Sequence, residues 1–410
     1  MEFTEPAEAP AKEGKNEVVQ SVIAGQTWTR KIGKCVDPNC VQVHVDGSHG
    51  WIDETGRGEG GVAAANNNEQ QQDEKDAAYV SPADRKISPL DVMETRPAEG
   101  QTYVYLVGTQ GSKVTLIEDS LNYLADSLED LTLRSNLVAS MNGIQNLPSL
   151  TRLELYDNQI ESIEYLESVS KLTILDLSFN AIREMGAVAA CPLLEELYVA
   201  QNKLRKIEGI EGLQCLKILD LGANRIRSLK DCGLDHLVNL ESLWLGKNKI
   251  ELIEGIGRLS KLRKLDVQNN RLTSIGSAGD AAAAGGHEGE DVGIAMLPAL
   301  EELYLACNAI ADVKGLPLGS PLNTLDLSTN QISSLEGIEH HKGLAELWMT
   351  ASNLSSMKQL EPLKGLPEIS CLYLEHSPIA RDYEYRKAIT AMLPTLVQLD
   401  ATEVNRGAMK

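Results

Sequence analysis

Asparagine returns at a nearly constant interval through the middle of this chain, each time at the same place in a pattern of leucines. The copies are Asn136, Asn158, Asn180, Asn202, Asn224, Asn248, Asn270, Asn308 and Asn330. Six of the eight intervals between them are 22 residues long. The surrounding pattern is L-x-x-L-x-L-x-x-N-x-I/L, as in LTILDLSFNAI from Leu172. Eleven copies align, and serine replaces asparagine in the last two, at Ser352 and Ser377. Such self-similarity indicates a repeat protein and not an ordinary globular core.

The repeat pattern predicts an α/β fold, a leucine-rich-repeat solenoid in which 22-residue units form a right-handed horseshoe. Each L-x-L segment should form a short strand with its leucines pointing inward. These strands should stack in parallel, about 4.8 Å apart, as a concave sheet. The second half of a repeat has a three-residue apolar period, which favours 3-10 turns or short helices on the convex side. The buried asparagine amide must find backbone partners in its own turn and in the neighbouring repeat, and serine can do less of this.

Composition divides the chain near residue 101. Residues 1–101 hold few periodic apolar positions and include a low-complexity stretch, so we expect a largely disordered N-terminal extension. Within it, residues 27–54 are a candidate for a small local motif. Four possible zinc ligands lie in this segment with the spacing C-x4-C-x3-H-x4-H: Cys35, Cys40, His44 and His49. The spacing suits zinc only weakly, because no tight C-x2-C pair is present. A partner-binding segment or a small local fold is favoured over a metal site, and we predict no cofactor.

We expect the solenoid to cover residues 102–380, with an imperfect leading repeat at 102–127. The repeat that begins at Leu262 is longer than the others, because it contains a stretch of Ala, Gly and acidic residues at 277–293. This composition predicts a loop that leaves the solenoid on the side away from the strands.

Residues 381–410 should form a cap that closes the C-terminal end of the stack. Asp382 is a candidate helix N-cap, and Tyr385, Ile389 and Leu393 would share one helical face. Val397 and Leu399 then predict a last short strand.

The charge balance limits the kind of partner. A formal net charge of -21 and a pI near 4.8 argue against nucleic acid and anionic membranes, and suit a partner with basic patches or serve solubility alone. We expect no secretory signal, since the first residues are polar and acidic, and no membrane span, since no apolar run approaches about 18 residues. The seven cysteines are then most simply reduced thiols of a nuclear or cytosolic protein. We expect a monomer outside its complex.

The residue between the two strand leucines should point out of the concave face, and its composition is unusual. In chain order this position holds Thr132, Glu154, Asp176, Tyr198, Asp220, Trp244, Asp266, Tyr304, Asp326, Trp348 and Tyr373. Five are aromatic and five acidic, although only 4% of the chain is Phe, Trp or Tyr. Glu346 adds a carboxylate two residues before Trp348. Solvated, strand-favouring residues are the plainer explanation, but an exposed aromatic and acidic ladder is typical of a protein-binding surface.

An enzymatic function is not supported by the sequence. Carboxylate pairs can act as acid and base, but here they would line an open sheet without accompanying histidines. No nucleophile motif, metalloprotease motif or Walker loop is present. We therefore predict a non-catalytic protein.

Several stretches closely resemble the regulatory subunit 7 family of protein phosphatase 1, itself built of leucine-rich repeats. They are LTRLELYDNQI, LDLSFN, LESLWLGKNKI, LAELWM and the ending LYLEHSPIARDYEYRKAITAMLPTLVQLDATEV. The resemblance covers about 102–405 and implies a nuclear and cytoplasmic subunit that binds the phosphatase catalytic subunit through its concave face. The family's acidic and aromatic contact positions match Asp176, Tyr198, Asp220, Trp244, Asp326, Glu346, Trp348 and Tyr373.

The chain departs from that family at a few of these positions. The family usually has Phe at the positions of Tyr198 and Trp244, Glu at that of Asp220, and Asn at those of Ser352 and Ser377. An alternative is a repeat adaptor of axonemal or cytoskeletal assemblies that uses the same face for another partner.

Overall fold

A computed structural model describes residues 18–23, 26–31, 86–276 and 293–404. Near the N-terminus, β1 (Val18–Ile23) pairs antiparallel with β2 (Gln26–Lys31). The four zinc candidates Cys35, Cys40, His44 and His49 lie outside the described residues, as do most of the 27–54 motif and residues 277–292 of the insertion.

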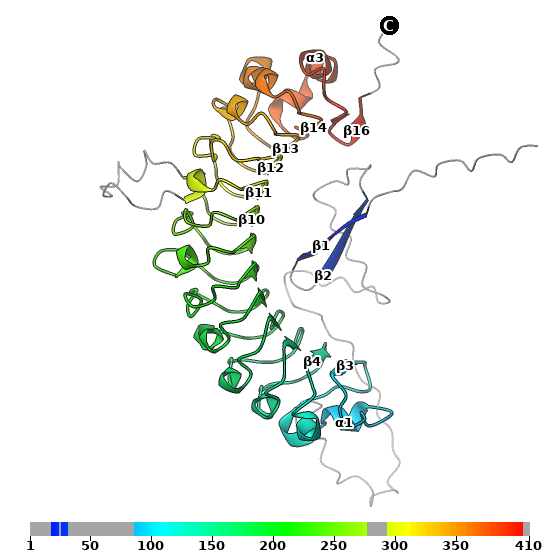
Figure 1. Ribbon diagram of the computed structural model, residues 1–410. Coiled ribbons are helices and arrows are strands. Elements are labelled where there is room, and N and C mark those ends of the chain that lie inside the picture. Colours follow the sequence, from blue (N-terminus) through cyan, green and yellow to red (C-terminus); the bar gives the residue numbers. More distant parts are fainter. Residues whose placement is uncertain (1–17, 24–25, 32–85, 277–292, 405–410) are drawn as a thin grey trace, which may run out of the picture. The chain divides into compact units, whose positions relative to one another are not determined.

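The repeats form one 14-stranded sheet in which neighbours along the chain are neighbours in space. Its strands are β3 (Tyr103–Val107), β4 (Asp130–Arg134), β5 (Arg152–Glu154), β6 (Ile174–Asp176), β7 (Glu196–Tyr198), β8 (Ile218–Asp220), β9 (Ser242–Trp244), β10 (Lys264–Asp266), β11 (Glu302–Tyr304), β12 (Thr324–Asp326), β13 (Glu346–Trp348), β14 (Cys371–Tyr373), β15 (Gln398–Leu399) and β16 (Thr402–Glu403). All pairs are parallel except β15 with β16. The predicted leucine-rich-repeat solenoid is confirmed, with its strands on the concave side (Figure 1).

Short 3-10 helices occupy the convex side, as the three-residue period predicted (Figure 1). They are η2 (Glu118–Leu124), η3 (Ile144–Asn146), η4 (Leu166–Ser168), η5 (Gly186–Ala190), η6 (Leu234–His236), η7 (Gly293–Met296), η8 (Ile338–His340), η9 (Met357–Gly365) and η10 (Pro378–Arg381). Between the two layers runs a continuous core in which nearly all consensus leucines and isoleucines are fully buried. Stacking buries what a single repeat could not bury alone.

The asparagines join each repeat to the one before it. Asn202 donates from Nδ2 to the carbonyls of Leu177, Val199 and Ala200 at 2.9, 3.2 and 3.0 Å, and its Oδ1 accepts from the Ile182 amide at 2.9 Å. The residue before the asparagine is left-handed, as in Gln201 with φ 53°. The same conformation recurs along the stack, so each turn accepts a strained non-glycine residue that the amide network holds in place.

The two serine turns differ, as predicted. The hydroxyl oxygens of Ser352 and Ser377 lie 2.9 Å apart, and the Ser352 amide donates to Ser377 Oγ at 3.0 Å. Ser377 Oγ also donates to the Met349 carbonyl at 3.3 Å. One hydroxyl thus replaces only part of the hydrogen bonding of an asparagine amide.

The N-terminal end of the stack begins before the expected boundary at residue 102. The Ile87 amide donates to Thr115 Oγ1 at 2.9 Å, and α1 (Pro89–Val92) places Leu90 against the core. The leading repeat predicted at 102–127 is present, with β3 parallel to β4.

The C-terminal cap is present, but two of its details were predicted wrongly. Helix α3 (Tyr385–Met392) starts after Glu384, whose amide donates to Asp382 Oδ1 at 3.0 Å, so Asp382 shapes the preceding turn and is not the N-cap. Val397 is 63% exposed and precedes the strand, which is Gln398–Leu399. The helix is anchored by the Tyr385 hydroxyl, which donates to the Asp400 carboxylate at 2.9 Å.

A candidate protein-binding face

The strand register stacks equivalent side chains of successive repeats directly beside one another. The outward residues between the strand leucines, here called the central column, run from Thr132 on β4 to Tyr373 on β14. From Asp176 to Trp348 the column strictly alternates between aspartate and an aromatic residue. Trp244, for example, is paired with Asp220 on β8 and with Asp266 on β10. The sequence-predicted residues are therefore brought together on one face of the sheet.

The expectation that this ladder is exposed is wrong for most of its members. Asp220 is 0%, Trp244 7% and Tyr373 4% exposed, whereas Tyr198, Tyr304 and Trp348 are partly exposed. Strands in a sheet lie only about 4.8 Å apart, so broad rings on neighbouring strands cover the short carboxylates between them. The face presents ring surfaces with carboxylates set below them.

Each aspartate of the alternating segment also has a structural role in its own strand end. Asp176 Oδ1 accepts from the Ser178 amide at 2.9 Å. The same bond, from the amide two residues on, is made at 2.9 Å by Asp220, Asp266 and Asp326. These hydrogen bonds fix the carboxylates in place and satisfy backbone amides beside the sheet.

Burial strongly affects the ionisation of two of these carboxyls. Loss of solvation raises the pKa of Asp176 to about 6, against the opposing hydrogen bond from Ser178. Loss of solvation raises the pKa of Asp266 to about 7, and the Asp220 and Asp326 carboxylates two strands away contribute in the same direction. The negative charge of the face therefore depends on pH. A cation brought close to the face would stabilise the ionised form of these carboxyls.

The aromatic side chains are held by polar contacts at their edges. The hydroxyls of Tyr198 and Tyr304 donate to Glu196 and Glu302, each at 2.8 Å. Lys264 lies 5.2 Å from the centre of the Tyr304 ring, which is 6.3 Å from that of Trp348. Trp244 Nε1 is buried and has no hydrogen-bond partner among the described residues.

The C-terminal end of the ladder has a polar contact of its own. The Tyr373 hydroxyl accepts from Gln398 Nε2 at 2.9 Å, which ties the ladder to the cap strand β15. Glu346 lies on β13 two residues before Trp348 and is partly exposed.

The first repeats carry a different arrangement on the same face. Arg152 pairs with Glu154 and lies 3.8 Å from Asp130, and Arg134 lies 3.9 Å from Glu154. The Arg134 guanidinium also lies 4.5 Å from the centre of the Tyr156 ring. Acidic side chains here are matched by arginines of the same sheet, which leaves less negative potential for a partner.

The sequence reasoning missed two exposed aromatic residues at the start of the sheet. Tyr103 and Tyr105 on β3 are 61% and 62% exposed, and they lie in register with Asp130 and Thr132. Their repeat lacks the asparagine, so the repeat pattern does not mark it. The alternation in TYVYLV (102–107) was the available signal.

Two further features of the described ranges bear on function. No group of three or more His, Cys, Asp or Glu side chains there is placed to hold a metal ion. No helix in these ranges is both long enough and apolar enough for a membrane span.

Comparisons with known proteins agree with this fold. Models of the leucine-rich repeat match residues 170–189, 214–272 and 290–408. The structure is similar to a leucine-rich-repeat protein of Leptospira interrogans, with a TM-score of 0.62 and 24% identity over 73% of this chain and 72% of that one. It is also similar to an internalin of Listeria monocytogenes, with a TM-score of 0.55 and 22% identity over 75% of this chain and 88% of that one. The chain is a leucine-rich-repeat protein.

A shorter match points to a particular group of such proteins. Over 70 residues the chain is 39% identical to the protein phosphatase 1 regulatory subunit SDS22 of Saccharomyces cerevisiae. This match covers 16% of the chain and 21% of that yeast protein.

Proposed function

We propose that this protein is a non-catalytic regulatory subunit that binds the catalytic subunit of protein phosphatase 1 through its concave face. The alternation of aspartates and aromatic rings along the central column is the observation on which the proposal rests. The residues of the proposed binding face are Asp176, Tyr198, Asp220, Trp244, Asp266, Tyr304, Asp326, Glu346, Trp348 and Tyr373.

The chemistry of the face supports a protein partner with basic groups. Partly exposed rings such as Tyr304 and Trp348 offer large, rigid contact area, which is typical of interface anchors. Carboxylates fixed between the rings attract cations in surroundings of low dielectric. Trp244 contributes by positioning its neighbours, because it is 7% exposed and has little surface for direct contact.

The choice of partner is supported by the partial similarity to the yeast phosphatase regulatory subunit. The sequence resemblance of the concave positions and of the C-terminal ending favours the same partner. A nuclear and cytoplasmic location belongs to the same proposal.

Capture of the purified phosphatase catalytic subunit by the immobilised full chain tests the proposal. We expect the wild type to retain the catalytic subunit, and the double variant Tyr304→Ala, Trp348→Ala to lose most of it, because both partly exposed anchors are removed. Tyr383→Ala is the matched control, since Tyr383 is 91% exposed and lies beside the cap helix, off the face.

Two outcomes would contradict this function. Equal capture by the double variant and the wild type would exclude the concave face as the binding site. Absence of capture by a folded wild-type protein would exclude the phosphatase as the partner. The same face would then belong to an adaptor for another partner, such as a cytoskeletal assembly.

A further inference from the structure

A second surface, built from residues that follow the strands and not from the strands themselves, concentrates positive charge in this acidic protein. Just after the asparagine turns of four successive repeats lie Arg183, Lys203, Arg205, Arg225, Arg227 and Lys249, here called the basic edge. In two of these repeats the cations flank a fully buried apolar residue: Lys203 and Arg205 flank Leu204, and Arg225 and Arg227 flank Ile226. The backbone therefore alternates, and the cations share one side of it.

The cations repeat because the solenoid repeats. Arg183, Arg205 and Arg227 occupy one position of three consecutive repeats and form one row along the edge. A second row holds Lys203, Arg225 and Lys249. Stacking places members of a row on neighbouring segments, so like charges are held close together despite their repulsion.

The backbone under these side chains is fixed. The Lys203 amide donates to the Ile182 carbonyl and the Arg225 amide to the Leu204 carbonyl, each at 2.8 Å. The Leu204 amide donates to Asn224 Oδ1 at 3.0 Å. A ligand would therefore meet a preorganised row of cations and need not order the chain.

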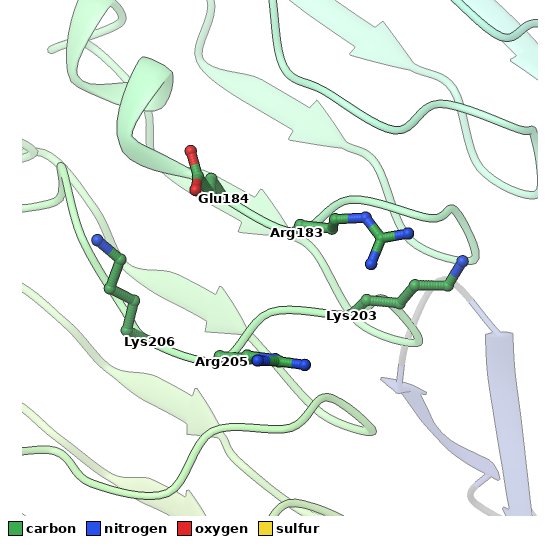
Figure 2. A pocket seen from close by; sticks show the side chains of 5 residues that line it. All are labelled: Arg183, Glu184, Lys203, Arg205 and Lys206. Carbon is green, nitrogen blue, oxygen red and sulfur yellow. The ribbon is translucent and has the colours of Figure 1, made fainter.

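The basic edge encloses two adjoining hollows. One, of about 410 Å³, is lined by four cations and no acid: Arg205, Arg225, Arg227 and Lys249. The other, of about 450 Å³, shares Arg205 and adds Arg183, Glu184, Lys203 and Lys206. In Figure 2 the side chains of Arg183, Lys203 and Arg205 extend in one direction, whereas those of Glu184 and Lys206 extend away from them.

Within the ranges that the structure describes, none of the six residues of the basic edge forms an ion pair, whereas Lys206 pairs with Glu208 at 2.5 Å. The first row ends at Arg227, because Glu251 holds the equivalent position of the next repeat, and Arg271, which follows Lys249 in the second row, lies 3.8 Å from Glu251. On the other side the first row begins at Arg183, because the preceding repeat has Glu161 at the equivalent position.

We propose that the basic edge binds a phosphorylated segment of a partner polypeptide. A phosphomonoester carries a charge of about -1.5 to -2 near neutral pH, and its oxygens accept paired hydrogen bonds from guanidinium groups. Three arginines and a lysine around one acid-free hollow suit such a group better than a single carboxylate. The net charge of -21 would repel a long polyanion such as a nucleic acid, whereas a short segment lies within the screening length of the local cations.

Fluorescence anisotropy with the full chain tests this proposal. The probes are a labelled peptide of Gly, Glu and phosphoserine, its unphosphorylated serine counterpart, and a labelled single-stranded oligonucleotide, all at about 150 mM salt. We expect the phosphopeptide to bind at least about tenfold more tightly than the serine peptide, and Arg205→Glu, Arg227→Glu to weaken its binding about tenfold or more.

Lys171→Glu, Lys314→Glu is the matched control, since both lysines are exposed and lie away from the basic edge. It makes the same change in net charge, so its phosphopeptide affinity should stay within about twofold of the wild type. Equal affinity for the two peptides, or unchanged binding by Arg205→Glu, Arg227→Glu with a retained melting transition, would overturn the proposal. So would an oligonucleotide that binds as tightly as the phosphopeptide. None of these outcomes involves the phosphatase, so the concave-face proposal is tested separately.

Discussion

Two regions of one concave sheet deal with acidic side chains in opposite ways. On β4 and β5, Asp130 and Glu154 are met by arginines of the same face. From β6 to β13 the aspartates of the central column lie between aromatic rings, and Lys264, on the same strand as Asp266, pairs with Glu302 at 2.8 Å. The repeat geometry is the same, so the difference comes from the residues at the outward positions.

This difference indicates which part of the face keeps carboxylates available for a partner. An acid that is already paired with arginines of its own face, as Glu154 is, is neutralised and offers little energy to an incoming chain. A carboxylate buried between rings is costly to ionise alone, and it gains most when a partner brings a cation. We therefore assign binding to β6–β14 and expect β4–β5 to be nearly neutral in it.

The largest change in stability is expected at Trp244, because its ring is packed within the face and has little exposed surface. Trp244→Ala should lower the free energy of unfolding by about 3–5 kcal/mol, because it leaves a cavity between Asp220 and Asp266. Tyr105→Ala on β3 should change the free energy of unfolding by less than about 0.5 kcal/mol, since that ring is 62% exposed. Urea denaturation measures both.

Trp244→Phe sharpens this test. It keeps the ring and removes the buried Nε1 donor that has no partner among the described residues, so it should cost less than about 1.5 kcal/mol. A loss as large as that of the alanine variant would show that the indole itself, and not ring packing, supports the ladder.

The second effect is a dependence of stability on pH. The Asp266 carboxyl has a pKa of about 7 when folded, against an ordinary value of 3.8 for aspartate. The folded state therefore keeps a proton that the unfolded chain has lost, and stability should fall as pH rises from about 4 to about 7 and then level off. Asp266→Asn can still accept the Gln268 amide, and should be more stable than the wild type by about 2 kcal/mol at pH 8.

Parallel denaturation curves at about pH 4 and 8 measure this effect. Equal stability differences between wild type and Asp266→Asn at both pH values would contradict the burial of an ionisable ladder.

The third effect is on association with the proposed partner. Asp220→Asn, Asp326→Asn should slow association with the phosphatase catalytic subunit about tenfold at low salt, because the carboxylates steer a basic surface. The difference should shrink as salt is added. Stopped-flow or surface-binding kinetics give the rate constants, and a salt-independent difference would argue for lost contacts in place of steering.

The smallest effect belongs to the other region. The Arg152–Glu154 pair should contribute about 0.5 kcal/mol in a double-mutant cycle, since the arginine is 40% exposed and the pair is screened by solvent. A coupling as large as the loss of stability expected for Trp244→Ala would remove the distinction between the two regions.

Much of the fold follows from the sequence, because repeated leucines and asparagines leave one arrangement that buries them all. The cap details were less accessible, since Asp382 and Glu384 are both plausible at the start of α3 and the turn decides between them. The membership of the central column was also predictable, because strand alternation fixes which residues share a face.

The burial of that column was not predictable from alternation alone. Trp244 is only 7% exposed although its neighbours across the strands are the short Asp220 and Asp266, so the packing around its ring is given by the stacked structure and not by alternation. The sequence analysis did not predict the basic edge, because it considered only the outward positions of the strands. The 22-residue recurrence of Arg183, Arg205 and Arg227 was present in the sequence throughout.

Calorimetric titration of the purified phosphatase catalytic subunit into the full chain tests the central claim most directly, with Trp348→Ala and Arg152→Ala compared under one condition. We expect the wild type to bind, Trp348→Ala to raise Kd about 30-fold or more, and Arg152→Ala to leave Kd within about twofold. No binding by the wild type, or equal losses in the two variants with both proteins folded, would contradict this claim.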